Sequence, residues 1–504
     1  MRLSRRVLMV RVMSLSSSRP TYGNFSRPRT AGLSNLSSLA TAIIFLGFLA
    51  TISAFMLGDV WAALVVALIF ALLTVLVVAG NGHGMSLLEI ILEAAMWQVA
   101  KLKKENRYRS GPAGQVPGVR FTLPGIGARL SVADARDGFG RDFAVVELGG
   151  GLYSITFASE PDGASLVDPE VIDKRVAQWG AFLASLTVEP GLVGAQVTVE
   201  SSPDTGDRLA LEVGSQVDPE APGLAREVLS QLVETYPMGS AKMRTWITLT
   251  FRGRSKNPEE VRHELATQLP GLSARLMGTG AGAVRPVASD ELAEILRMAY
   301  DPMIAPDIER ARVQGDPVKI DFEDAGPSAL DAHWRSMDHD SGTSMSWTLA
   351  VPPRGKVYSS ILSRLLEPDA RLLRKRVSLV FSPIESGRAA NIVETDRRNA
   401  QIRVRSVDRP SARSQMELAS AERTADEEAA GAGLTDFSMI VTATGEHGAD
   451  LRELESTIAN AAATARVKLR PAYGAQSSAF LMALPLGFIP AQLSRVPAAI
   501  KAAL

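Results

Sequence analysis

Cysteine is absent from the sequence. Its absence excludes disulfide bonds, thiol nucleophiles and every cysteine-ligated metal site, and it suits a reducing compartment. An excess of charge of either sign is absent too, because 54 basic residues balance 54 acidic ones. The net charge therefore gives no reason to expect nucleic acid as a partner, and any functional polarity has to be local.

Signature motifs of nucleotide-binding and hydrolytic enzymes are also missing from the 504 residues. A P-loop, written G-x-x-x-x-G-K-[ST], needs a lysine to meet the phosphate charge, and neither G-x-S-x-G nor H-E-x-x-H occurs. The nearest candidate is the turn MGTGAGAVRP at 277–286, with Gly278, Gly280 and Gly282. It lacks the lysine and the hydroxyl residue that close the motif, so we interpret it as an ordinary turn.

Histidine and carboxylate side chains come together in one segment, DAHWRSMDHD, which holds His333, Asp338, His339 and Asp340. A spacing of six does not place both rings on one helical face, so a polar loop is favoured over a metal site. The acidic DFEDAG run at 321–326 fits a solvated turn, or a site for a cation or a basic partner. We therefore predict no catalytic residues, no cofactor-binding residues, no metal ligands and no enzymatic activity.

Long uncharged stretches do occur, at 39–57 and 60–79. As a helix each is about 30 Å long, which matches the hydrocarbon core of a bilayer. With Asp59 as the only formal charge between Arg29 and Glu89, neither stretch has a polar face. The sequence predicts a transmembrane helical hairpin at 36–80.

The charges on either side of this hairpin predict its orientation. The leader at 1–35 carries seven arginines and no acidic residue, whereas the turn has no Lys or Arg. The arginines are Arg2, Arg5, Arg6, Arg11, Arg19, Arg27 and Arg29. Because basic flanks stay cytoplasmic, we expect a multi-pass protein of the inner (plasma) membrane, with lipid as a partner and with both termini and the following domains in the cytoplasm.

The segment 81–127 combines a helix with a Gly/Pro connector. Residues 85–100 have apolar side chains at helical spacing, with Glu89 and Glu93 on another side. Two interpretations stay open, an amphipathic helix at the membrane surface and a helix packed on the next domain. The Gly/Pro-rich residues 110–127 then break any helix and mark a boundary.

Beyond the connector, strand and helix patterns alternate, which indicates an α/β (α+β) fold. We predict a first mixed α/β lobe at 128–300, a linker at 301–342 rich in turn residues, and a second α/β lobe at 343–504. The strand order is left open.

The second lobe is interrupted by residues 388–431, which contain no aromatic residue. We predict a helical hairpin whose first arm has a net charge of +3 and whose second arm has −3. It is either a solvated excursion or a docking arm for another subunit. The arginines of 397–409 raise a third possibility, nucleic-acid binding, which nothing else in the sequence supports.

Several long segments carry a resemblance to a known family: RPTYGNFSRPRTAGL, YRSGPAGQVPGVRFTLPG, SEPDGASLVDPEVIDKRVAQWGAFLASLTVEPGLVGAQVTVE and ETYPMGSAKMRTWITLTF. Together they resemble a family of membrane proteins of actinobacterial conjugative and integrative elements, over most of residues 19–487. The hairpin is similar to the small two-span subunit that accompanies the type IV secretion ATPase.

The second lobe and the passage RPAYGAQSSAFLMALPLG (470–487) resemble the N-terminal, non-ATPase portion of that same ATPase. In that family a motor domain with a P-loop follows, whereas 17 residues follow Gly487 here. The resemblance implies a non-enzymatic component of a conjugation or type IV-like secretion machine. Its partners would be a separate ATPase and other membrane subunits, in a hetero-oligomer. Two alternatives stay open, an EccE-like subunit of type VII secretion and an enzyme that binds nucleotide through the glycine turn.

Overall fold

The computed structural model describes residues 38–490, and within this range it leaves out a few short stretches. These are residues 59, 80–86, 115–119, 162, 164–166, 219, 236–240, 317, 354–356 and 407–408. The basic leader predicted for 1–35 and the charge of Asp59 at the apolar turn therefore lie outside the described residues.

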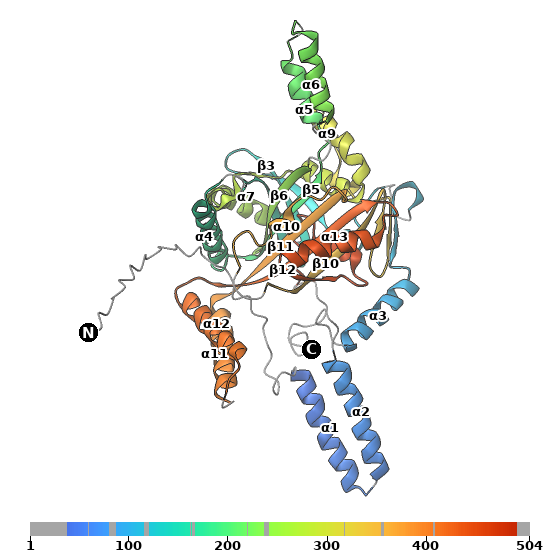
Figure 1. The fold of residues 1–504 in the computed structure, drawn as a ribbon, viewed down its shortest axis with the longest axis vertical. Helices are drawn as coiled ribbons and strands as arrows, with labels where there is room; N and C mark the ends of the chain where they lie inside the picture. Colours follow the sequence, from blue (N-terminus) through green and yellow to red (C-terminus); the bar gives the residue numbers. More distant parts are fainter. Residues whose placement is uncertain are drawn as a thin grey trace, which may run out of the picture.

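Two apolar helices, α1 (Ser38–Met56) and α2 (Val60–Val78), lie side by side and project from the rest of the protein (Figure 1). Gly47 allows the close approach, because a Cβ at this position would lie 2.6 Å from the Cβ of Phe70. By length and composition α2 is long and apolar enough to cross a membrane, and 11% of its apolar window is buried. The described apolar part of α1, Thr41–Met56, is shorter. The membrane span predicted at 39–57 therefore stays a prediction.

The predicted helix at 85–100 is present as α3 (Leu87–Leu102), and it leads directly into the first strand. Thirteen strands of the described residues then form one sheet, in the order β1-β8-β9-β10-β12-β11-β5-β6-β4-β3-β2, with β13 beside β10 and β7 beside β4. All of these pairs are antiparallel. The bounds are β1 (Arg107–Arg109), β2 (Ser131–Arg136), β3 (Asp142–Gly149), β4 (Leu152–Glu160), β5 (Leu192–Pro203), β6 (Ala241–Arg252), β7 (Ala283–Pro286), β8 (Ala329–Ala332), β9 (Met337–His339), β10 (Gly342–Val351), β11 (Arg374–Ile384), β12 (Leu434–Glu446) and β13 (Lys468–Pro471).

The mixed α/β composition is confirmed, but the two predicted lobes are not separate bodies. Strand β11 of the second lobe pairs with β5 of the first, from Lys375 opposite Ser201 to Phe381 opposite Ala195. The predicted linker at 301–342 is wrong as well, because it forms α9 (Ala305–Val313), β8 and β9 and contributes buried side chains such as Leu330 and Met337. Its frequent turn residues reflect short elements rather than a domain boundary.

Helices cover both faces of the sheet. On one face lie α4 (Pro169–Leu186), α7 (Pro258–Leu276), α10 (Ser363–Leu366) and α13 (Leu451–Thr464). On the other face α8 (Ser289–Tyr300) and α14 (Gln476–Met482) pack around Val146 and Trp246. Burial of these apolar faces is the main favourable term in the stability of the fold.

Two helical hairpins leave the sheet in opposite directions (Figure 1). The hairpin predicted within 388–431 is present as α11 (Ser386–Arg405) and α12 (Ala412–Ala429), and it projects to the same side as α1 and α2. The other consists of α5 (Asp207–Gln216), which the sequence pattern did not reveal, and α6 (Gly223–Thr235). It projects to the side away from α1 and α2.

Candidate functional site

The two histidines of the DAHWRSMDHD segment have different surroundings. His333 is exposed, and its Nε2 lies 2.9 Å from Asp338 Oδ2. His339 is buried, with Nδ1 2.5 Å from the carbonyl oxygen of Tyr300 and Nε2 2.7 Å from Ser344 Oγ. Among the described residues no group of three or more His, Asp or Glu is arranged to hold a metal ion.

The hydrogen bonds of His339 define its protonation. A carbonyl oxygen can only accept, so Nδ1 carries the proton and donates to Tyr300, while Nε2 accepts from the Ser344 hydroxyl. Burial lowers the pKa of His339 to about 4, although the bond to Tyr300 and the nearby carboxylates of Asp340 and Asp338 act in the opposite direction. The ring is therefore neutral at physiological pH, which suits a structural role.

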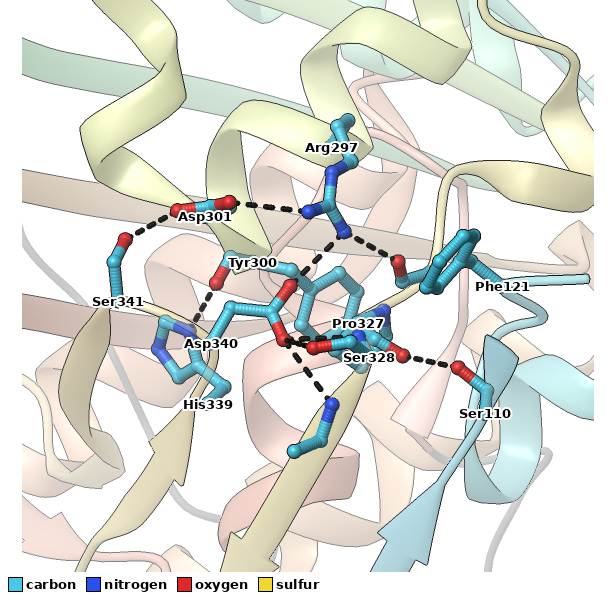
Figure 2. Close-up of polar contacts among 12 residues, drawn as sticks. Ser110, Phe121, Arg297, Tyr300, Asp301, Pro327, Ser328, His339, Asp340 and Ser341 are labelled. Atoms are coloured by element: carbon cyan, nitrogen blue, oxygen red, sulfur yellow. Dashed lines mark hydrogen bonds and ion pairs between the residues drawn. The ribbon is translucent and has the colours of Figure 1, made fainter. Parts of the chain in front are cut away.

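Asp340 and Arg297 form the centre of a polar network between α8 and the β8–β9 region (Figure 2). Arg297 donates to Asp340 Oδ2 at 2.9 Å and to the carbonyl oxygen of Gly326 at 2.8 Å, and it pairs with Asp301. Asp340 Oδ1 accepts from the backbone N–H and the hydroxyl of Ser328. Each ionised group thus has several partners, which is the condition for stable burial of charge.

The same network attaches the Gly/Pro connector to the segment that was predicted as a linker. Ser110 donates its hydroxyl to the carbonyl oxygen of Pro327 at 2.6 Å, and Phe121 N donates to Asp324 Oδ1 at 3.0 Å. The acidic run at 321–326 also provides Glu323, which pairs with Arg120. The carboxylates of Glu323 and Asp324 are therefore engaged within the protein, and the network is a clasp between two distant stretches of chain.

The glycine turn at 277–286 has a packing explanation. Gly280 and Gly282 have φ of 82° and 66°, a left-handed conformation that favours glycine. A Cβ on Gly282 would lie 1.8 Å from the carbonyl oxygen of Glu160, and one on Gly280 would lie 3.0 Å from the Arg175 side chain. The glycines are thus required where the turn approaches β4 and α4.

A buried ion cluster, which the sequence reasoning missed, lies at one end of the central strands. Glu200 of β5 accepts from Arg374 at 2.7 Å and from Arg376 Nε at 3.0 Å, and all three side chains are buried. Burial alone would raise the pKa of Glu200, but the charges of Arg376, Arg374 and Arg244 outweigh it and lower the pKa to about 2. The available signal was the presence of charged residues within strands: Glu200 in β5, Lys242 and Arg244 in β6, and Arg374 and Arg376 in β11.

A second set of ion pairs extends from this cluster to the α5–α6 hairpin. Arg244, beside Glu200 on β6, pairs with Glu309 of α9, and Lys242 reaches the same carboxylate at 3.4 Å. Arg310 of α9 lies 3.5 Å from Asp207, the first residue of α5. The base of the hairpin is therefore connected to the sheet through charged side chains.

The passage 482–487 crosses the sheet face opposite α13, where strand side chains bind its backbone. Six carbonyl oxygens each accept a hydrogen bond. The pairs are Ser154–Leu486 (2.7 Å), Thr156–Pro485 (2.9 Å), Gln196–Leu484 (2.9 Å), Gln196–Met482 (3.1 Å), Thr250–Gly487 (2.7 Å) and Ser378–Ala483 (2.6 Å). Because a buried backbone outside regular structure needs partners, this row of polar side chains permits the passage to be buried.

Helix α3 connects the apolar helices to the sheet through aromatic contacts. Trp97 of α3 lies against Trp334, with ring centroids 6.1 Å apart, and Trp334 stacks on Tyr473 at 5.5 Å. Other apolar side chains of α3 remain exposed: Leu87, Ile91, Leu92, Met96, Val99 and Leu102. One side of α3 is thus packed on the sheet domain, while among the described residues an apolar side has no contact that buries it.

In a comparison with protein families, residues 29–89 match the family described as Domain of unknown function (DUF8461). The matched residues contain α1, α2 and the first residues of α3. No curated protein matches the chain.

Proposed function

We propose that the protein is a non-enzymatic component of the inner (plasma) membrane that holds a separate ATPase of a conjugation or type IV-like secretion machine in place. The observation that carries the proposal is the arrangement of its projections. The exposed apolar pair α1–α2 leaves one side of the sheet domain, and the α5–α6 hairpin leaves the opposite side (Figure 1).

Membrane anchorage is supported by the exposure of the α1–α2 side chains. Phe45 and Leu49 on α1 and Trp61 and Leu68 on α2 are exposed. A contiguous apolar surface of this kind is rare on proteins surrounded by water. In our proposal both helices cross the bilayer, with snorkelling and local thinning accommodating the shorter apolar part of α1.

The proposed orientation places the sheet domain and both termini in the cytoplasm. The arginine-rich leader of the sequence supports this orientation, together with Lys101 in the last turn of α3 and Lys103 and Lys104 just after the helix. In this orientation the exposed apolar side chains of α3 lie at the membrane interface, while Trp97 keeps the helix against the sheet.

The ATPase contact is assigned to the α5–α6 hairpin, which points into the cytoplasm in this arrangement. Leu224, Val228 and Leu232 are spaced by four residues on α6 and are 76%, 55% and 52% exposed. Residues 207–235 contain six acidic and two basic residues. The partner surface would accordingly be an apolar groove with a basic rim.

Two alternatives differ from this proposal in their partners. An EccE-like role predicts recovery of type VII secretion subunits, and a nucleotide-binding enzyme predicts hydrolysis that depends on Gly280 and Gly282. The close approach of Gly282 to Glu160 gives these glycines a packing role instead.

The deciding experiment is affinity purification of the tagged full chain in mild detergent from a host that carries its neighbouring genes. The expected result is co-purification of a secretion ATPase, with no ATP hydrolysis by the purified chain alone. Recovery of type VII subunits only, or hydrolysis abolished by Gly280→Ala, would contradict the proposal. Extraction of the chain by carbonate without detergent would contradict the anchorage itself.

A further inference from the structure

The α11–α12 hairpin has an uneven distribution of charge along its length. Its distal half, residues 397–416, which we call the tip, contains six arginines and one aspartate. The half of α12 nearer the sheet, residues 417–429, contains five acidic residues and one arginine. Positive charge is therefore concentrated at the end that lies farthest from the sheet.

The arginines of the tip differ in whether they form ion pairs. Arg397 pairs with Glu394 at 2.9 Å, and Arg403 lies 3.8 Å from Glu417, which links the two helices. Arg398 is exposed and lies 3.9 Å from Glu394. Arg405 and Arg409 are exposed, and no ion pair within the described residues involves them. The tip consequently has cations available for an external anion.

Two apolar side chains are exposed among these cations. Ile402 is 57% exposed on α11 and Met416 is 67% exposed on α12. The contact between Arg403 and Glu417, their immediate neighbours, places them at the same height of the hairpin. Basic and apolar side chains on one surface are the combination that binds the interface of an anionic bilayer.

The direction in which the α11–α12 hairpin projects also fits an anionic bilayer as its partner. In Figure 1 it extends from the sheet to the side of α1 and α2, and its tip lies at the level where α1 begins. If α1 and α2 enter a bilayer there, the tip meets the headgroups of the same leaflet. From charge, apolar exposure and position together, we propose that the tip is a second membrane contact, which binds anionic lipid headgroups and fixes the rotation of the sheet domain relative to the bilayer.

Nucleic acid is the competing anion, and the structure favours it less. Double-stranded DNA is recognised along a groove by cations distributed over its length, whereas here the half of α12 beyond the tip is acidic and would repel phosphates. Exposed Ile402 and Met416 have a role in a lipid interface but not in phosphate contact. The lipid proposal rests on the membrane anchorage proposed above, so its test has to separate the two.

The absence of cysteine makes a labelling experiment straightforward. Ser406→Cys, next to the tip arginines, is labelled with an environment-sensitive fluorophore in the full chain. The protein is reconstituted in nanodiscs of phosphatidylcholine alone or mixed with phosphatidylglycerol. We expect blue-shifted emission and several-fold weaker acrylamide quenching in the anionic nanodiscs, and a return to the neutral-lipid values at high salt.

Three further variants make the result decisive. Charge reversal at Arg398, Arg405 and Arg409 to Glu is expected to abolish the lipid effect, and these exposed positions leave the helices intact. A label at Ser215→Cys on α5 is expected to remain fully quenched in every nanodisc. A label at Leu68→Cys reports anchorage, because it should be protected in both lipids.

The outcomes separate the two proposals. Equal quenching of the tip label in both lipids, with Leu68→Cys protected, overturns the second contact and leaves the anchorage standing. Full quenching at Leu68→Cys overturns the anchorage. Protection of the tip label by added double-stranded DNA in neutral nanodiscs, without an effect of anionic lipid, assigns the arginines to nucleic acid and also overturns the proposal.

Discussion

Trp97 of α3 contacts Trp334, in the turn between β8 and β9, with ring centroids 6.1 Å apart and planes inclined by 55°. Gly474 makes room for this contact, since a Cβ there would lie 2.9 Å from the Trp334 ring. The pair connects the first helix after α1–α2 to a segment more than 200 residues further along the chain. Of the two interpretations of α3 left open by the sequence, packing on the following domain is therefore observed for one side of the helix.

Replacing Trp97 with Ala should release α3 from the sheet domain. The loss of a partly buried indole predicts destabilisation of roughly 1–2 kcal/mol, below the cost for a fully buried Trp. Hydrogen exchange of the full chain in detergent is expected to speed up in 87–102 and around Trp334, with the central strands unchanged. Met96→Ala on the exposed side is the matched control, and equal effects of both variants would show that Trp97 does not hold the helix.

Replacing Glu200 with Gln should strongly destabilise the sheet. The neutral amide leaves the buried guanidinium groups of Arg374 and Arg376 without a counter-charge, and breaking a buried pair in this way costs on the order of 3–5 kcal/mol. Denaturant unfolding of the full chain in detergent measures the change. Asp142→Asn removes an exposed pair with Arg136 and should leave the unfolding midpoint in place. A similarly small effect of Glu200→Gln would show that the cluster is unimportant for stability.

The sequence predicted the elements better than their assembly. Alternation of apolar and polar residues located β4, β5 and β6, and charge patterning located the α11–α12 hairpin. Ser154, Thr156 and Thr250 are polar positions of that alternation, yet they are buried and bind the 482–487 backbone. A periodicity of two distinguishes the faces of a strand, but it does not say what covers the polar face.

The single sheet and the clasp at Asp340 were missed for a related reason. Pairing of β5 with β11 joins residues about 180 apart, and no local pattern specifies such a register. The polar loop predicted for DAHWRSMDHD is instead the end of β8, a short turn and β9, and His339 is buried. The partners of Asp340 and His339, which are Arg297 and Tyr300, lie on a different element, α8. Long-range partners of this kind require the fold itself.

Replacing Gln196 with Leu tests the buried passage. Gln196 donates to the carbonyl oxygens of Met482 and Leu484 and accepts from Gly487 N, so the apolar replacement leaves buried backbone groups unsatisfied, at roughly 1–3 kcal/mol for each. Faster hydrogen exchange and new proteolytic cleavage near 482–487 are the expected results. The variant Gln196→Glu removes the donor to the Met482 and Leu484 carbonyl oxygens and keeps an acceptor for Gly487 N, so the Gly487 amide should stay protected in this variant and lose protection in Gln196→Leu. Unchanged exchange in both variants would mean that the side chain of Gln196 does not hold the passage.

The stability of the protein should fall as the pH drops from about 6.5 to about 4. Burial lowers the pKa of His339 to about 4, whereas its value in the unfolded chain is near 6.5. In this window the unfolded state binds a proton that the folded state does not, which favours unfolding by on the order of 3 kcal/mol at the lower end. Below about 4 both states are protonated and the loss ends. His339→Asn keeps a donor for the Tyr300 carbonyl oxygen, and it should flatten the dependence of the unfolding free energy on pH in this window. An unchanged pH dependence in the variant would assign the effect to other groups.

Replacing Leu224, Val228 and Leu232 with Gln tests the assignment of the ATPase contact. The three side chains are exposed on α6, so polar replacements should change the free energy of unfolding by about 0.5 kcal/mol or less for each site. If these three side chains form the contact with the ATPase, they carry most of the binding affinity. Their replacement should then reduce recovery of the ATPase at least about ten-fold. The matched control is Ile402→Gln with Met416→Gln, which removes exposed apolar side chains from the other hairpin. If the triple α6 variant recovers as much ATPase as the control variant, the ATPase binds elsewhere. Equal losses in both variants would mean that binding of the ATPase depends on the position of the whole sheet domain at the membrane.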